Sequence, residues 1–213
     1  MTVIVYRWRL EQPDEASVAA FSPGYAIALV VGAALGGFGL GTLNLMLTDV
    51  PGIGRSIIGA LAGTILAVEL YKSLRGISGS TGLVFVAGFS TTVMIGRMGC
   101  LLSGLEDQTY GTVTNLPWGW DFGDGLARHP VPLYESASMA AFLIFALVSL
   151  ANRAPFFMKH GFYLLVGFYG AQRFVWEFFK PYGTLFGSFN VFHVVCVVLI
   201  AYAFKLIIRN RDY

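Results

Sequence analysis

Charged residues are scarce in this sequence: Asp, Glu, Lys and Arg make up 12% of its 213 residues. An ordinary soluble domain carries about twice that share, so a soluble globular protein is excluded. Cysteine is also scarce, since Cys100 and Cys196 are the only two, and both lie in apolar runs. This excludes a disulfide framework, and we expect both thiols to pack as small apolar side chains.

Apolar residues are abundant instead, making up 56% of the chain and giving a mean hydropathy of +0.68. A helix that crosses a bilayer needs roughly 20 mostly apolar residues. Runs of this kind, separated by polar breaks, lie near residues 24–47, 53–74, 81–102, 133–152, 159–180 and 187–208. The sequence therefore predicts an all-α integral membrane protein with about six transmembrane helices.

One transmembrane domain is predicted over residues 24–208, between an N-terminal segment of residues 1–23 and a tail of residues 209–213. The N-terminal segment lacks the short apolar core of a signal peptide, so we expect the first long run to be a retained helix. Its first part, Met1–Leu10, either lies on the membrane surface or is extended. One long loop, about residues 103–132, is rich in turn-forming and aromatic residues, and we expect it to be ordered.

The orientation follows from the loop lysines and arginines, which favour the cytoplasmic side. If the N-terminus is inside, the inner segments hold Arg7, Arg9, Lys72, Arg75, Arg153, Lys159, Lys205, Arg209 and Arg211. The outer segments then hold only Arg55, Arg128 and Lys180. The sequence therefore predicts that both termini are cytoplasmic and that loop 103–132 lies outside.

Glycines recur at a spacing of four in the first run, as Gly32 and Gly36 and again as Gly37 and Gly41. Small residues at this spacing let two helix backbones approach closely in a membrane. We expect these glycines to pack against a neighbouring helix.

Two charged sites lie inside apolar runs, where a charge is costly and points to function. One is Arg97, and the other is the segment YGAQRFVWEFF, in which Tyr169, Arg173 and Glu177 share one helix face with Gln172 beside them. An ion pair between Arg173 and Glu177 is the simplest interpretation, and it leaves Arg97 without a partner. If both arginines face one cavity, the site is cationic and suits a phosphate, which in a bilayer belongs to a lipid headgroup.

The outer loop adds further candidates in the segment RHPVPLYE, which contains His129, Tyr134 and Glu135. His129 is either a general base or an inert loop histidine. Glu135 near a helix start either caps that helix or faces the site. Trp118 and Trp120 are expected to anchor the loop at the interface, and the acids of DFGDG suggest a calcium site only faintly.

These segments resemble the prolipoprotein diacylglyceryl transferases of bacterial inner membranes. The likeness rests on GRMGCLLSG, YGTVTNLPWG, RHPVPLYE and YGAQRFVWEFF, which occur in family order. The resemblance implies a transferase that moves a diacylglyceryl group from phosphatidylglycerol to the cysteine thiol of a lipoprotein precursor, releasing glycerol phosphate. Its partners are then phosphatidylglycerol or another anionic phospholipid. A lipoprotein precursor and a larger membrane complex stay open as further partners, and no cofactor, metal or nucleic acid is expected.

The resemblance also implies roles for single residues. Arg97, Arg173, Glu177, Tyr169 and His129 correspond to catalytic positions, with both arginines holding phosphate and balancing charge on the leaving group. The lipid headgroup site adds the signature glycines Gly99 and Gly104 and the LYE residues Tyr134 and Glu135.

Several positions depart from the family pattern. Ile58 in SIIGA stands where the family has a histidine implicated in catalysis, and Cys100 and Ser103 stand where it has asparagines. The family's first helix is expected to be absent, which accounts for six helices. His129, Glu177 and Glu106 are the alternative bases. A non-catalytic lipid-binding or structural subunit of a membrane complex is therefore the second hypothesis. The third is a transporter, although this sequence shows no inverted repeat of the kind typical of that class.

Overall fold

The computed structural model describes residues 1–10, 22–47 and 51–209. Its long helices are α3 (Pro23–Leu47), α4 (Ile57–Arg75), α5 (Val86–Leu102), α6 (Val131–Ala151), α7 (Pro155–Glu177) and α8 (Val191–Arg209). The short elements are α1 (Thr2–Val5), the π-helix η1 (Tyr6–Leu10), the 3-10 helices η2 (Leu83–Phe85) and η3 (Gly104–Asp107), and the strands β1 (Trp120–Asp121) and β2 (Ala127–Arg128).

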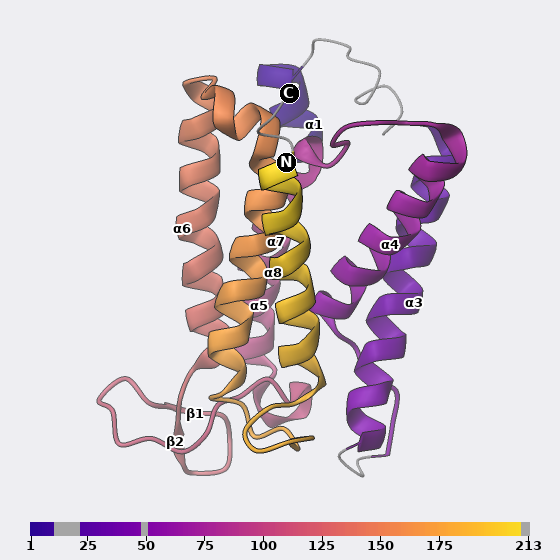
Figure 1. The fold of residues 1–213 in the computed structure, drawn as a ribbon. Coiled ribbons are helices and arrows are strands. Elements are labelled where there is room, and N and C mark those ends of the chain that lie inside the picture. Colours follow the sequence, from indigo (N-terminus) through magenta and orange to yellow (C-terminus); the bar gives the residue numbers. More distant parts are fainter. Residues whose placement is uncertain (11–21, 48–50, 210–213) are drawn as a thin grey trace.

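Five helices in the described part of the chain are long and apolar enough to cross a membrane: α3, α4, α5 together with η2, α6 and α8. The sixth long helix, α7, spans 23 residues and is more polar because it carries Lys159, Arg173 and Glu177. It packs between α6 and α8 (Figure 1). The prediction of an all-α, multi-pass membrane protein is confirmed.

The helix ends differ from the predicted runs where a side chain caps a helix. The second run was expected from residue 53, but α4 begins at Ile57 because the Ser56 hydroxyl accepts the Gly59 N–H at 3.1 Å. The last run was expected from residue 187, but α8 begins at Val191 because Asn190 Oδ1 accepts the Phe192 and His193 amides. The intervening residues 178–190 therefore form a non-helical segment at the same end of the bundle as loop 103–132 (Figure 1).

The glycines of α3 bring α4 into direct backbone contact, as predicted. A Cβ at Gly36 would lie 2.8 Å from Gly63 Cα, and one at Gly32 would lie 2.7 Å from the Ala67 Cβ. A Cβ at Gly41 would collide with the backbone of Gly54. Helices α3 and α4 therefore form a tight hairpin, which leans away from the bundle of α5–α8 (Figure 1).

The buried apolar core lies mainly within the bundle of α5–α8. Val86, Met139, Leu150, Leu165 and Val166 are almost completely buried. Helices α1 and η1 and the C-terminal end of α8 lie at the same end of this bundle (Figure 1). The helices at the N-terminus show that residues 2–10 are not extended, so that alternative is wrong for them; residues 11–21 and 210–213 lie outside the described part.

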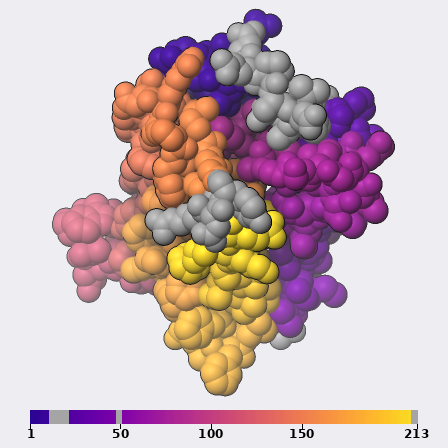
Figure 2. Space-filling model, turned by 45° about the horizontal axis from the view of Figure 1, so that its top comes forward, coloured from indigo at the N-terminus to yellow at the C-terminus, as the bar shows by residue number. Residues whose placement is uncertain are grey.

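The outer loop lies at the opposite end and is ordered, as predicted. Strands β1 and β2 pair antiparallel, with Trp120 opposite Arg128. Asp121 Oδ1 accepts the amides of Gly123, Asp124 and Gly125 at 2.8–3.1 Å, so this oxygen serves the turn. Figure 2 shows the loop projecting from the side of the molecule away from the α3–α4 hairpin.

Candidate functional site

Five ionisable side chains form a buried charge cluster near the end of the bundle that carries loop 103–132. Arg97 comes from α5, Glu135 from α6, Arg173 and Glu177 from α7, and Lys180 from the segment that follows α7. Each of these residues is at most 5% exposed. Three are cations and two are carboxylates, so the cluster has one positive charge in excess.

Glu135 is the hub of this cluster, because all three cations contact it. Its Oε2 lies 2.5 Å from Nε of Arg97. Its Oε1 accepts from Nη1 of Arg173 and from Nζ of Lys180, the latter at 2.9 Å. The expectation that Arg97 lacks a partner is therefore wrong, and so is the interpretation of Glu135 as a helix cap, since the side chain is 1% exposed and faces the cations.

Glu177 is the second carboxylate, and it lies at the edge of the cluster. It pairs with Nη2 of Arg173 at 2.9 Å, one helical turn away, as the sequence predicted. Lys180 Nζ is more distant, at 4.0 Å. Its other oxygen, Oε1, accepts the side-chain amide of Asn190 at 3.0 Å. Glu177 therefore has one close cation, whereas Glu135 has three.

Local sequence explains why these groups meet. On α7, Tyr169, Arg173 and Glu177 follow one another at intervals of four and so lie along one face. Pro132 in the first turn of α6 favours a helix start there, which places Glu135 one turn inside the helix. The packing of α5 and α7 against α6 then brings Arg97 and Arg173 to the same carboxylate.

Tyr169 and Gln172 add neutral polar groups to the cluster. Tyr169 is 1% exposed, and its ring packs edge-on against Phe89 at a ring distance of 5.2 Å. Its hydroxyl interacts electrostatically with Arg97 and Arg173. Gln172 is 8% exposed, and neither atom of its amide has a hydrogen-bond partner among the described residues. A buried amide without a partner is unfavourable, so this group is open to a bound ligand.

His129 and Tyr134 lie in the outer layer and contact each other instead of the charge cluster. The His129 Nδ1 is 3.4 Å from the Tyr134 hydroxyl, and its ring packs against Phe179. The Tyr134 hydroxyl accepts the Trp118 Nε1–H at 2.9 Å. Of the two signature glycines, Gly104 adopts a left-handed conformation with φ of 70°, and Gly99 is exposed on α5.

Lys180 and Asn190 were missed in the sequence analysis, where Lys180 was counted only as a loop cation. Lys180 follows Glu177 by three residues and so continues the polar face of α7, which is the signal that identifies it. Asn190 has no such periodicity. Its contact follows only from the path of segment 178–190, which turns back toward α7 and brings the Asn190 amide to Glu177.

Tyr182 lies in segment 178–190 and is held beside this cluster. Lys180 Nζ is 5.8 Å from the centre of its ring. Burial raises the pKa of its phenol, and the neighbouring Glu177 carboxylate raises that pKa further. Tyr182 therefore stays protonated at neutral pH and serves as a hydroxyl group.

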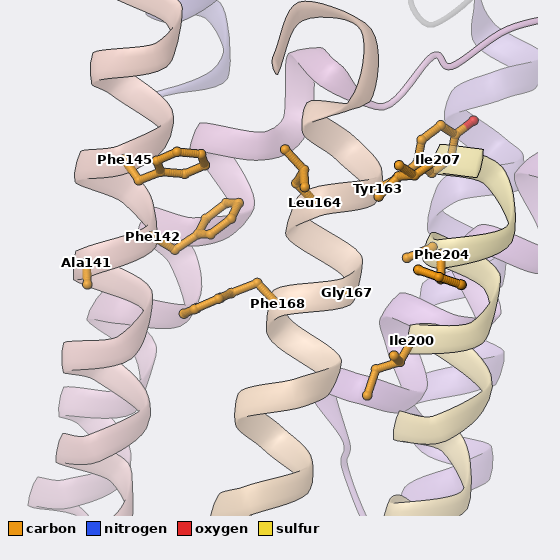
Figure 3. Close-up of a pocket in the computed structure, with 11 residues that line it drawn as sticks. Ala141, Phe142, Phe145, Tyr163, Leu164, Gly167, Phe168, Ile200, Phe204 and Ile207 are labelled. Carbon is orange, nitrogen blue, oxygen red and sulfur yellow. The ribbon is translucent and has the colours of Figure 1, made fainter. Parts of the chain in front are cut away.

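A large cavity of about 510 Å³ lies away from this cluster, on α6, α7 and α8 (Figure 3). Phe142 and Phe168 stack within it at a ring distance of 4.9 Å. No charged side chain is among the described residues that line it. It therefore suits hydrocarbon.

Comparison with known proteins agrees with the sequence motifs. The sequence model of one family, described as prolipoprotein diacylglyceryl transferase, matches residues 1–209. The chain belongs to the prolipoprotein diacylglyceryl transferase family. This confirms the resemblance drawn from the four sequence motifs.

Individual relatives carry the name phosphatidylglycerol–prolipoprotein diacylglyceryl transferase. The chain is 33% identical to the one from Geobacter sulfurreducens over 147 residues, which cover 65% of this chain and 54% of the relative. It is 30% identical to the one from Campylobacter jejuni over 167 residues, or 70% of this chain and 57% of the relative. The matches thus span a little over half the length of these relatives. No solved structure matches.

Ile58 occupies the position at which the sequence comparison with the family led us to expect a histidine. Ile58 lies in the first turn of α4 and is 1% exposed in the apolar core. It can neither accept nor donate a proton. The cluster itself holds two carboxylates, Glu135 and Glu177.

Proposed function

We propose that this protein is a phosphatidylglycerol-dependent diacylglyceryl transferase whose active site is the buried charge cluster. The observation that carries this proposal is the excess of one positive charge among Arg97, Arg173, Lys180, Glu135 and Glu177. An uncompensated buried charge is costly unless an anion completes the site. The phosphodiester of phosphatidylglycerol carries one negative charge and would complete it.

The arrangement supports a defined role for each cation. The phosphate binds beside Arg97, which pairs with a single carboxylate in the described part of the chain, and Arg173 and Lys180 lie around the same Glu135. When the thiol sulfur attacks the diacylglyceryl carbon, the carbon–oxygen bond to phosphate breaks and the phosphate gains a second negative charge. Fixed cations stabilise this gain in charge without reorganisation.

Glu177 is the group that we assign to receive the thiol proton. It has one close cation, Arg173, and a neutral partner, Asn190, so it is more available to a proton than Glu135 with its three cations. The unpartnered amide of Gln172 supports binding of the glycerol hydroxyls of the headgroup. His129 and Tyr134 then border the outer side of the site.

We further propose that the protein lies in the bacterial inner membrane with both termini cytoplasmic. The nine inner and three outer basic residues of the sequence support this orientation. The position of both chain ends at one end of the bundle, opposite the outer loop, agrees with it (Figure 1). In this orientation residues 24–208 form one domain, and the charge cluster lies nearer the outer side.

A turnover assay tests the transferase proposal. Purified protein in bilayer nanodiscs with phosphatidylglycerol and a cysteine-containing precursor peptide should yield a peptide heavier by one diacylglyceryl group, together with glycerol phosphate, by mass spectrometry. Arg97→Ala should abolish the product and Arg97→Lys should reduce it strongly, because Lys lacks the guanidinium fork. Arg209→Ala is the matched control, since Arg209 is exposed at the far end of α8.

The second candidate is a non-catalytic subunit that binds phospholipid within a membrane complex. The burial of Ile58 at the place of the family histidine favours it. Phosphatidylglycerol that stays bound to the wild-type protein but yields no product would support this candidate and refute the transferase. Loss of that bound lipid in Arg97→Ala would show that the cluster holds it.

A further inference from the structure

A second cavity, of about 340 Å³, lies between the α3–α4 hairpin and the bundle. Its walls are mainly apolar and come from α3, α4, α5, α7 and α8, including Leu29, Leu61, Phe89 and Leu165. We call it the hairpin groove. The hairpin and the bundle diverge on this side (Figure 1), and the groove follows α4 from Ile57 to Glu69.

Glu69 places a carboxylate at one end of the hairpin groove, toward the chain termini. Its Oε1 accepts from Lys72 Nζ at 3.0 Å and from the Tyr202 hydroxyl at 3.2 Å. No described residue bonds to Oε2, and the side chain is 43% exposed. The Lys72 side chain, in contrast, is 7% exposed. The mouth of an apolar groove thus carries a half-exposed negative charge, which suits a cation joined to an apolar segment.

An aromatic contact links the hairpin groove to the charge cluster. Phe89 lines the groove, and its ring packs edge-on against Tyr169 at 5.2 Å. Tyr169 in turn faces Arg97 and Arg173. An apolar segment lying in the groove would therefore be one aromatic ring away from Tyr169 of the proposed active site.

The length of the groove matches a particular kind of segment. Ile57 and Glu69 are separated by 12 residues of α4, or about 18 Å at the helical rise. The apolar core of a secretory signal has about 7–15 residues after a basic start, and as a helix it spans about 10–22 Å. A basic residue held at Glu69 would therefore let such a core lie along the groove beside α4, toward Ile57.

We propose that the hairpin groove docks the apolar segment of a lipoprotein precursor, with the basic residues before that segment bound to Glu69. This rests on the proposed function and orientation, in which Glu69 lies toward the cytoplasm. The groove takes the side chains of one face of the segment, because its volume is in the range of small-molecule sites and a whole helix does not fit. The opposite face stays in lipid.

Binding tests this proposal separately from turnover. Fluorescent precursor peptides with either lysine or glutamine before an identical apolar core are titrated against the protein in nanodiscs. Wild-type protein should bind the lysine peptide about two- to fivefold more tightly, the range expected for a partly exposed ion pair. Glu69→Gln should remove this preference and leave the affinity for the glutamine peptide unchanged, and Glu106→Gln, which changes an exposed outer carboxylate, should preserve the preference.

Crosslinking locates the bound segment. A photoreactive residue within the apolar core should label residues that line the groove on α4 or α5, such as Leu61 and Phe89, and spare the α6–α8 cavity. Equal affinity of wild-type protein for both peptides would overturn the proposal, and this test does not depend on the folding of any variant. Labelling of the α6–α8 cavity would also overturn it. So would an amine-headed phospholipid that stays bound in the groove and is not displaced by the peptide.

Turnover and docking fail in distinguishable ways. If the lysine preference depends on Glu69 but no product forms, the docking proposal stands and the transferase proposal falls. If product forms at the same rate from both peptides and with Glu69→Gln, the transferase stands and the docking proposal falls.

Discussion

Nε of Arg97 lies 2.5 Å from Oε2 of Glu135, and the two residues belong to different helices, α5 and α6. The same carboxylate also contacts Arg173 of α7 and Lys180 beyond it. One buried side chain therefore ties three parts of the bundle together. Its removal has consequences for the fold as well as for the site.

Glu135→Gln should strongly destabilise the protein, because three buried cations lose their shared counter-charge. Breaking a buried ion pair by removing one partner costs about 3–5 kcal/mol. Thermal unfolding in detergent measures the effect. Glu106→Gln, an exposed control outside the cluster, should melt as the wild type does, and an unchanged melting temperature for Glu135→Gln would contradict the role of Glu135 as hub.

Gly36→Ala should separate α3 from α4, since the added Cβ would meet the backbone of Gly59 and Gly63. Overpacking of this kind costs about 1–3 kcal/mol. Gly39→Ala on the same helix is the matched control, because nothing lies within 4 Å of a Cβ at that position. Denaturant unfolding of the two variants should differ by this amount, and equal stability would show that the hairpin tolerates a wider spacing.

Asn190 has two functions that substitutions can separate. Asn190→Ser keeps an oxygen that caps α8 but loses the amide that donates to Glu177. Asn190→Ala loses both, and a lost cap costs about 1 kcal/mol. We expect both variants to lose diacylglyceryl transfer by about tenfold or more, while only the alanine variant melts earlier. Full activity of the serine variant would show that the contact with Glu177 does not matter.

The structure of the outer loop should stay unchanged as the pH falls to the usual pKa of a carboxylic acid. Hydrogen bonds from the Arg128 guanidinium to Asp124 Oδ2, at 2.6 and 2.9 Å, lower the pKa of Asp124. A lowered pKa in the folded state means that the ion pair contributes at all pH values above the unfolded pKa, about 3.9, and is lost as the pH falls through the folded value. The loop should thus be unchanged from pH 8 to about pH 5.

Fluorine NMR of 5-fluorotryptophan at Trp120, whose strand pairs with that of Arg128, measures this transition. The resonance should shift only below about pH 4. Asp124→Asn should abolish the shift, because the side chain no longer titrates. A shift near pH 6 that persists in this variant would assign the transition to another group.

The positions of helices and of the charged face could be predicted from the sequence because both depend on local order. The apolar runs predicted the long helices, and the spacing of Arg173 and Glu177 predicted their ion pair. Helix ends were less accurate. Ser56 and Asn190 cap α4 and α8 through single hydrogen bonds that hydropathy does not register.

The sequence by itself determined that this is a helical membrane protein with arginines inside apolar runs, because composition and periodicity are properties of the chain alone. The partner of Arg97 was decided only by tertiary structure. Glu135, Lys180 and Asn190 reach the cluster from separate elements, and no spacing within one helix specifies a contact between two. The divergence of the α3–α4 hairpin from the bundle, and with it the groove at Glu69, likewise follows from packing between helices.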